Sequence, residues 1–187
     1  MEYWNVYDRA GSWTGRTVPK GTPFLLEEYH PAMEAWIVNG RGELLIQRRS
    51  PDCEVLPGIW GMTTGRMSAP PPPAEGLLSE PEGGWVDRGE TALEGCIREI
   101  GEELGLSVEV WETAFLRRIL RDELIWDLYL VCKDVPLSRL TLQRGEVSDA
   151  RWVTPEQLGK MVERGEFFFY PELWQVLRQV EGLAAAG

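Results

Sequence analysis

Residues 84–106 read GWVDRGETALEGCIREIGEELGL, and this stretch decides the fold that the chain is expected to adopt. Its second half predicts a helix, because Thr91 and Glu94 have the spacing of a capping box and Gly105 stands where helices commonly end. The apolar residues on one side of this helix would anchor it to a core, and they are Leu93, Ile97, Ile100 and Leu104.

The same helix carries a stripe of acidic side chains. Each residue turns a helix by about 100°, so Glu102 lies about 60° to one side of Glu99 and Glu103 about 40° to the other. We expect the stripe to face outward, away from the apolar side. Like charges four residues apart destabilise a helix, and a bound divalent cation would offset that repulsion. An ordinary solvated acidic face is the alternative interpretation of the stripe taken alone.

The spacing around the stripe is more specific than the stripe itself. From Gly84 through Glu90 and Arg98 to Leu106, the residues match G-x5-E-x7-R-E-U-x-E-E-x-G-U in full, where U is a bulky aliphatic residue. In this pattern the chain resembles the Nudix family. The resemblance implies an α/β protein with the Nudix fold, an α/β/α sandwich with a mixed β-sheet. It also implies a hydrolase that uses Mg²⁺ or Mn²⁺ and water to cleave a diphosphate linked to another group, such as a nucleoside diphosphate derivative.

The resemblance further implies roles for individual residues. The expected metal ligands are Glu99, Glu102, Glu103 and the backbone of Gly84. Glu90 and Arg98 would orient these carboxylates through hydrogen bonds, as a guanidinium fork beside carboxylates can do. An additional catalytic or metal-binding carboxylate is expected on a loop before a late strand, where Glu146 stands. A surface loop acid is the alternative interpretation of Glu146.

Residues outside this box resemble the branch of the family related to isopentenyl-diphosphate isomerase. The matching segments are Tyr7–Asp8, Thr14–Gly15, Tyr29–His30, Trp36–Asn39, Leu44–Ser50, Pro57–Trp60 and Glu146–Trp152. That isomerase protonates an alkene with a cysteine that follows the tryptophan, and it holds its metal with several histidines. Here residues 61–67 contain neither residue type, and His30 is the single histidine of the sequence. We therefore expect a hydrolase on an isomerase-like frame, with an isomerase-like enzyme or a non-catalytic diphosphate-binding module as alternatives.

Several residues outside the acidic stripe are candidate substrate contacts. They are Arg48, Arg49, Arg66, Trp60 and His30. Arginines offer paired N–H donors to phosphate oxygens, although arginines at strand ends are commonly surface residues. Trp60 and His30 have equally ordinary interpretations, as a packed tryptophan and a satisfied structural histidine.

The remainder of the chain predicts strands on both sides of the box and two helices after it. Extended segments are expected at 3–7, 13–18, 35–38, 44–48, 59–64, 108–120, 124–132 and 150–153, and helices at 155–164 and 171–183. We expect one Nudix domain over residues 1–187, with an N-terminal β extension in 1–30 and the box in 84–106. Residues 67–83 contain four consecutive prolines and predict an insertion loop near the substrate, either as a lid or as passive cover.

Composition limits the classes of partner. The 187 residues carry a net charge of -11, which argues against a nucleic-acid duplex, because duplex binders neutralise phosphates with basic side chains. The acidity is compatible with a divalent cation. The three cysteines, Cys53, Cys96 and Cys132, are irregularly spaced and indicate a reducing, cytoplasmic setting. With neither a signal peptide nor a membrane span in the pattern, we expect no membrane partner and a small-molecule diphosphate as substrate, and a homodimer is left open.

Overall fold

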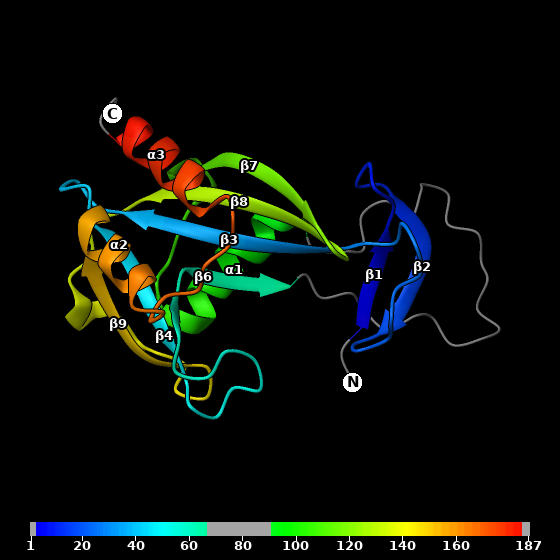
Figure 1. Cartoon of the computed structure of the whole chain (residues 1–187), viewed down its shortest axis with the longest axis horizontal. Helices are drawn as coiled ribbons and strands as arrows, with labels where there is room; N and C mark the ends of the chain where they lie inside the picture. The colour runs from blue at the N-terminus through cyan, green and yellow to red at the C-terminus, as the bar shows by residue number, and fades with distance from the viewer. Residues whose placement is uncertain (1–2, 67–90, 185–187) are drawn as a thin grey trace.

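A seven-stranded mixed sheet forms the centre of the computed structural model, which describes residues 3–66 and 91–184 (Figure 1). Its strands are β3 (His30–Val38), β4 (Leu44–Arg49), β5 (Trp60–Gly61), β6 (Thr63–Arg66), β7 (Thr113–Arg121), β8 (Leu124–Cys132) and β9 (Val147–Val153). β3 and β8 run parallel over their whole length, and the other neighbouring strands are antiparallel. The mixed sheet expected from the sequence is therefore confirmed.

The sheet opens between β3 and β4. These strands pair at two positions, Ile37 with Leu45 and Val38 with Leu44. Further along, β5 pairs with β4 and β6 pairs with β3, so residues 60–66 run through the gap between the two strands. The predicted strand at 59–64 is thus divided into two short strands. This opening brings side chains of β4 and β6 together on one face of the sheet.

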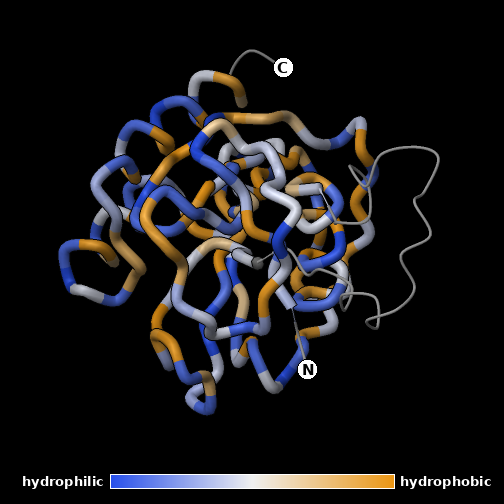
Figure 2. The backbone as a smooth tube through the Cα atoms, turned by 90° about the vertical axis from the view of Figure 1, so that its right-hand side faces the viewer, coloured by the Kyte–Doolittle hydropathy of each residue, from blue (hydrophilic) through white to orange (hydrophobic). Residues whose placement is uncertain are grey.

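Helices cover both faces of the sheet. α1 (Ala92–Leu104) packs on one face, and α2 (Pro155–Glu163) and α3 (Leu173–Ala184) pack on the other (Figure 1). Trp36 of β3 points into the core under α2 and α3, whereas its neighbour Ile37 points into the core under α1, because successive side chains of a strand alternate. Each fully buried side chain of this size contributes about 2 kcal/mol to stability. Hydrophilic and hydrophobic residues alternate along the outer segments of the backbone (Figure 2). The helices on both faces of the sheet confirm the predicted α/β/α sandwich.

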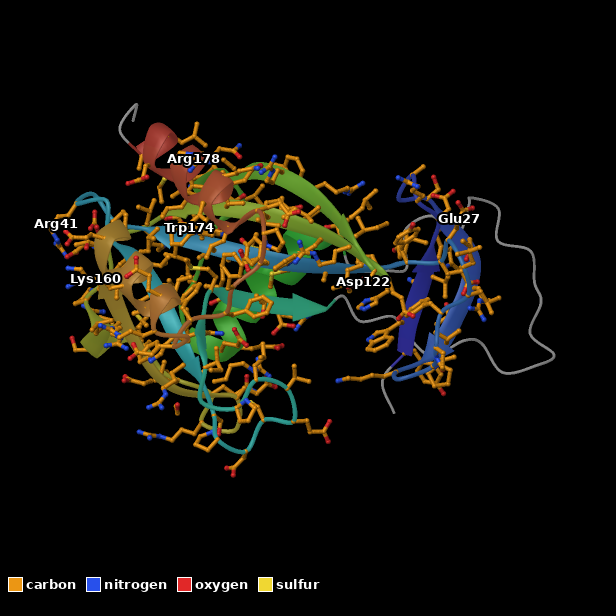
Figure 3. The ribbon with its side chains drawn as sticks, in the orientation of Figure 1. Glu27, Arg41, Asp122, Lys160, Trp174 and Arg178 are labelled. Carbon is orange, nitrogen blue, oxygen red and sulfur yellow. The ribbon has the colours of Figure 1, made fainter. Side chains whose placement is uncertain are left out.

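The N-terminal residues form a separate two-stranded sheet at one end of the molecule (Figure 1). Its strands are β1 (Tyr3–Tyr7) and β2 (Trp13–Pro19), close to the predicted segments. A small core of their own contains Trp4, Val6 and Val18, and a bridge between Tyr7 and Tyr29 joins the hairpin to the start of β3. The labelled side chains of Arg41, Lys160 and Arg178 lie at the opposite end of the molecule (Figure 3).

Two predicted elements begin later in the structure than in the sequence pattern. The strand expected from residue 108 is replaced at its start by a short 3-10 helix, η2 (Val110–Glu112), and β7 begins at Thr113. Local bonds explain the change, because the Glu112 carboxylate accepts from the Glu109 N–H at 2.9 Å and the Thr113 hydroxyl donates to the Val110 carbonyl at 2.6 Å. The last helix starts at Leu173, since the preceding residues form a turn in which the Leu173 N–H donates to the Tyr170 carbonyl.

The structure leaves some expectations unaddressed. The proline-rich insertion, Gly84 and Glu90 lie outside the described residues. In the described part of the chain, none of the helices has the length and apolar character needed to cross a membrane.

Candidate active site

α1 begins and ends where the sequence predicts. The Thr91 hydroxyl accepts from the Glu94 N–H at 3.2 Å, and the Glu94 carboxylate accepts from the Thr91 N–H at 2.8 Å, which completes the capping box. Gly105 has a φ of 64°, the left-handed conformation that favours glycine at a helix end. Both ends of the acidic helix are thus set by local sequence.

The segment that follows η3 (Leu137–Arg139) packs against the C-terminal end of α1. The Thr141 N–H donates to the Leu104 carbonyl at 2.9 Å, and the Gln143 N–H donates to the Glu103 carbonyl at 3.0 Å. The Glu146 N–H then donates back to the Gln143 carbonyl at 2.8 Å. These bonds satisfy carbonyls that a helix end leaves without partners and bring Glu146, just before β9, beside the acidic stripe.

The three carboxylates of α1 differ in their exposure. Glu103 is 1% exposed, the Glu99 side chain is 15% exposed and the Glu102 side chain is 52% exposed. The expectation that the whole stripe faces outward is therefore wrong for Glu103. Its side chain enters the opening between β3 and β4 and contacts Gln47 of β4.

Burial and mutual repulsion raise the pKa of two of these groups. For Glu103, burial raises the pKa to about 8, with a hydrogen bond from Gln47 opposing the shift and the charges of Glu99 and Glu146 adding to it. For Glu99, burial raises the pKa to about 7, the guanidinium of Arg98 opposes the shift, and the charge of Glu146 adds to it. The carboxylate of Glu146, in the loop before β9, therefore lies close enough to Glu99 and Glu103 for its charge to act on both, although Glu146 itself is exposed.

Two polar residues of the sheet, Gln47 and Thr63, form a hydrogen-bonded pair that contacts Glu103. Gln47 Nε2 donates to Glu103 Oε2 at 2.6 Å, and the Thr63 hydroxyl donates to Gln47 Oε1 at 3.3 Å. Gln47 and Thr63 are both buried. The sequence interpretation did not single out either residue, although a glutamine among the apolar residues of strand 44–49 was a signal for a buried polar role.

Two arginines lie close to the carboxylates. Arg98 Nη1 contacts Glu99 Oε1 at 3.1 Å and Glu102 Oε2 at 2.9 Å, so its guanidinium lies beside two of the carboxylates. Arg49 lies near enough to Glu103 to lower its pKa, and its Nε donates to the Val55 carbonyl at 2.7 Å. Arg49 thereby links the loop after β4 to the acidic face.

Three of the other candidate substrate contacts lie away from the carboxylates. Arg48 Nε donates to the Gly58 carbonyl at 2.9 Å, and Trp60 belongs to the core under α2 and α3, with the Arg151 guanidinium 3.8 Å above its ring. His30 is buried and stacks on Trp4 at 4.6 Å between ring centroids, where the hairpin meets β3. Arg66 is the last residue of β6.

The donor set fits a hard divalent cation by its chemistry. Carboxylate oxygens are preferred ligands of Mg²⁺, and a cation would relieve the repulsion among Glu99, Glu103 and Glu146. Within residues 3–66 and 91–184 the side chains do not form a ready-made group of three metal-binding residues. Arg98 pairs with Glu99 and Glu102. A cation bound by these carboxylates would therefore either displace Arg98 or share their oxygens with it.

The chain is similar to known proteins in sequence and in fold. Residues 28–173 match the model of the NUDIX domain family. The chain is 33% identical over 170 residues to the uncharacterised Nudix hydrolase lmo0368 of Listeria monocytogenes, covering 91% of this chain and 90% of that protein. Two solved structures share the fold. DR0079 from Deinococcus radiodurans has a TM-score of 0.68 at 19% identity, covering 96% of this chain and 99% of that one. The NUDIX domain of Shewanella oneidensis NrtR, complexed with ADP-ribose, has a TM-score of 0.53 at 14% identity, covering 88% and 92%.

The family model spans most of the chain, and the Listeria relative aligns over nearly the full length of both proteins. Together with the helix-borne carboxylates, these matches establish that the chain belongs to the Nudix hydrolase family.

Proposed function

We propose that the protein hydrolyses a diphosphate linked to another group by attack of water at phosphorus, with a divalent cation held by the carboxylates of α1. The observation that carries this proposal is the placement of Glu99, Glu102 and Glu103 along α1, with Glu146 before β9 close enough to raise the pKa of both Glu99 and Glu103. Such a group is unfavourable by itself and becomes useful when it holds a cation. Membership of the Nudix hydrolase family supports the same chemistry.

Mg²⁺ or Mn²⁺, when bound, would supply polarisation of the diphosphate, neutralisation of developing charge and activation of a water. Glu99, Glu102 and Glu103 would hold the cation through their carboxylate oxygens, with the backbone of Gly84 as a further contact. Arg98 keeps two of these carboxylates oriented through its ion pairs. Glu90 keeps the orienting role that its place in the box suggests.

We assign Glu146 as the group that accepts the proton of the attacking water. It comes from the loop before β9, so it can act on the water while the carboxylates of α1 hold the cation. Glu99 or Glu103 as the base is the alternative. Glu146→Gln should lower kcat and leave the affinity for Mn²⁺ within twofold of wild type if Glu146 is the base, whereas a large loss of affinity would make it a ligand.

For the group attached to the diphosphate, we propose a nucleoside diphosphate derivative. The ADP-ribose complex of the NrtR domain, a protein of the same fold, supports this choice. Arg49 is our first candidate for a phosphate contact, because its guanidinium lies on the Glu103 side of β4, and Arg48 and Arg66 are weaker candidates. Trp60 and His30 are buried among aromatic and apolar groups, so we assign them no substrate contact.

A cleavage screen over nucleoside, sugar, coenzyme and isoprenoid diphosphates tests the proposal, with the phosphorylated products detected by mass spectrometry and Mg²⁺ and Mn²⁺ supplied separately. We expect turnover of at least one nucleoside diphosphate derivative and its loss in excess EDTA. Undiminished turnover in EDTA would contradict the metal-dependent mechanism. Binding of a diphosphate without any cleavage would instead favour the non-catalytic module.

A further inference from the structure

A chain of two hydrogen bonds links the sheet to the one fully buried carboxylate of α1. Thr63 of β6 donates its hydroxyl to Gln47 Oε1 at 3.3 Å, and Gln47 of β4 donates its Nε2 to Glu103 Oε2 at 2.6 Å. All three side chains are buried. Two strands and a helix, brought together by the opening in the sheet, therefore meet at Glu103.

The two hydrogen bonds have a definite direction. A carboxylate that binds a cation is ionised and only accepts hydrogen bonds, so with Glu103 in this form the amide must present its NH₂ group to Glu103 and its oxygen to the Thr63 hydroxyl, which can donate. A flipped amide would place two acceptor oxygens against each other in a buried space, which is unfavourable. The Thr63 hydroxyl thus holds the Gln47 amide in the orientation that Glu103 requires.

The bond from Gln47 also sets the orientation of the carboxylate. Among the residues that the structure describes, Gln47 makes the one side-chain hydrogen bond to Glu103, and it engages Oε2. This bond restrains the carboxylate through one oxygen and leaves Oε1 for other partners. A buried hydrogen bond of this kind restricts rotation that a solvated carboxylate would retain.

The neutral amide is suited to support a cation ligand. A lysine or arginine at position 47 would pair with Glu103 and cancel the negative charge that attracts a cation. An amide donates a hydrogen bond and leaves that charge in place. Groups behind metal ligands commonly act in this way, by orienting the ligand.

We propose that Gln47, held in its orientation by Thr63, is a positioning residue that aims the Glu103 carboxylate at the divalent cation. This inference rests on the proposed function, in which Glu103 is a cation ligand. It gives the sheet a supporting role toward the metal ligands, whereas the orienting residues expected from the sequence, Glu90 and Arg98, both lie within residues 84–106. Gln47 itself touches neither the substrate nor the reacting atoms.

The experiment measures Mn²⁺ affinity of the full-length protein from the loss of the free Mn²⁺ signal in electron paramagnetic resonance. Gln47→Met keeps the approximate length of the side chain and removes the donor, and we expect it to weaken Mn²⁺ binding by about 10- to 100-fold. Thr63→Val removes the hydroxyl and should weaken binding in the same direction. Thr63→Ser keeps a hydroxyl and should restore affinity to within about threefold of wild type.

Gln179→Met is the matched control, because Gln179 also uses its Nε2 in a partly buried hydrogen bond, to the Leu116 carbonyl at 2.9 Å on the other side of the sheet. It should lower the melting temperature and leave Mn²⁺ affinity unchanged. If Gln47→Met does not fold, the comparison of Thr63→Val with Thr63→Ser decides the question alone.

The outcomes separate this inference from the proposed function. Wild-type affinity in both Gln47→Met and Thr63→Val, with lowered melting temperatures, would overturn the positioning role and leave the hydrolase proposal standing. A wild-type protein that binds Mn²⁺ and cleaves no diphosphate would overturn the proposed function, while the variant series still decides the role of Gln47. A wild-type protein that binds no Mn²⁺ would overturn both.

Discussion

A Cβ atom on Gly65 would lie 2.4 Å from Cγ and 2.5 Å from Oε1 of Glu99, so β6 passes directly against this side chain of α1. Such distances are too short for any residue with a Cβ unless Glu99 moves. Gly61, earlier in the same stretch, is different, because a Cβ there would meet the Phe168 Cβ at an ordinary 3.9 Å. The two glycines form a matched pair for testing whether the position of Glu99 matters.

Gly65→Ala should displace Glu99 and lower kcat/KM at least tenfold, a loss of about 1.4 kcal/mol in transition-state stabilisation. Overpacking should lower the free energy of unfolding by about 1–3 kcal/mol. Gly61→Ala should leave kcat/KM within about twofold, since ordinary packing contacts absorb it. Steady-state kinetics of both variants check this, and wild-type activity in Gly65→Ala would show that Glu99 is free to move without consequence.

Glu103→Gln should lower kcat about 100-fold, because it removes a charged cation ligand. Its effect on stability depends on pH. The folded-state pKa of Glu103, about 8, lies above the ordinary 4.5, so in excess EDTA the wild-type protein loses stability as pH rises from 4.5 through 8. The variant lacks this loss and should be the more stable protein at pH 9.

Urea unfolding in EDTA at pH 5 and pH 9 measures that difference, and the exposed Glu109→Gln serves as the control. Equal stability of Glu103→Gln and wild type at pH 9, together with near-wild-type kcat, would mean that burial does not oppose the ionisation of Glu103 and that Glu103 is not a cation ligand.

The sequence was sufficient to predict the helix α1, but it was insufficient to predict the residues of the sheet that contact Glu103. Thr91, Glu94 and Gly105 are local signals, and the structure has the predicted caps. The burial of Glu103 could not be read from helix periodicity, because it depends on β4 leaving β3 after Leu45. That divergence is a property of strand pairing between distant segments.

The partners of the carboxylates on the sheet were missed for the same reason. Gln47 and Thr63 are 16 residues apart and meet through separate strand pairings. The predicted roles of Gly84, Glu90 and the insertion at 67–83 stay predictions, as do the isomerase-like branch, the cytoplasmic setting and the homodimer.

Glu34 gives a second pH-dependent prediction, independent of the carboxylates of α1. It is buried under α3, and its Oε1 accepts from Trp36 Nε1 at 2.6 Å and from the Tyr170 hydroxyl at 2.7 Å. Burial raises its pKa from 4.5 to about 7, and the two hydrogen bonds partly oppose the shift. The folded state therefore favours the protonated acid, and stability present below pH 4.5 is lost as pH rises through 7.

Glu34→Gln keeps an acceptor oxygen for both donors and cannot ionise. Between pH 4.5 and pH 8, the free energy of unfolding of wild type should fall by about 3 kcal/mol more than that of Glu34→Gln. Urea titrations across this range measure the difference, with the exposed Glu181→Gln as control. Parallel curves for Glu34→Gln and wild type would mean that Glu34 ionises as easily as an exposed acid.

The protein should not interconvert isopentenyl and dimethylallyl diphosphates. Residues 61–67 contain no cysteine, Cys96 is buried under the sheet, and Cys53 directs its Sγ toward the Glu146 backbone carbonyl at 3.5 Å. Incubation in D₂O followed by mass spectrometry should detect neither isomerised product nor deuterium in the prenyl group. Isomer formation that disappears in Cys53→Ser would make Cys53 the proton donor and contradict the hydrolase assignment.

The most direct test of water attack at phosphorus is the fate of oxygen from H₂¹⁸O during one round of cleavage of the best diphosphate substrate in Mg²⁺. The account predicts one ¹⁸O atom in one of the two phosphoryl products and none in the organic group, since the P–O bond is broken by water held at the carboxylates of α1. Label in the organic group as a new hydroxyl, or products free of label, would contradict it.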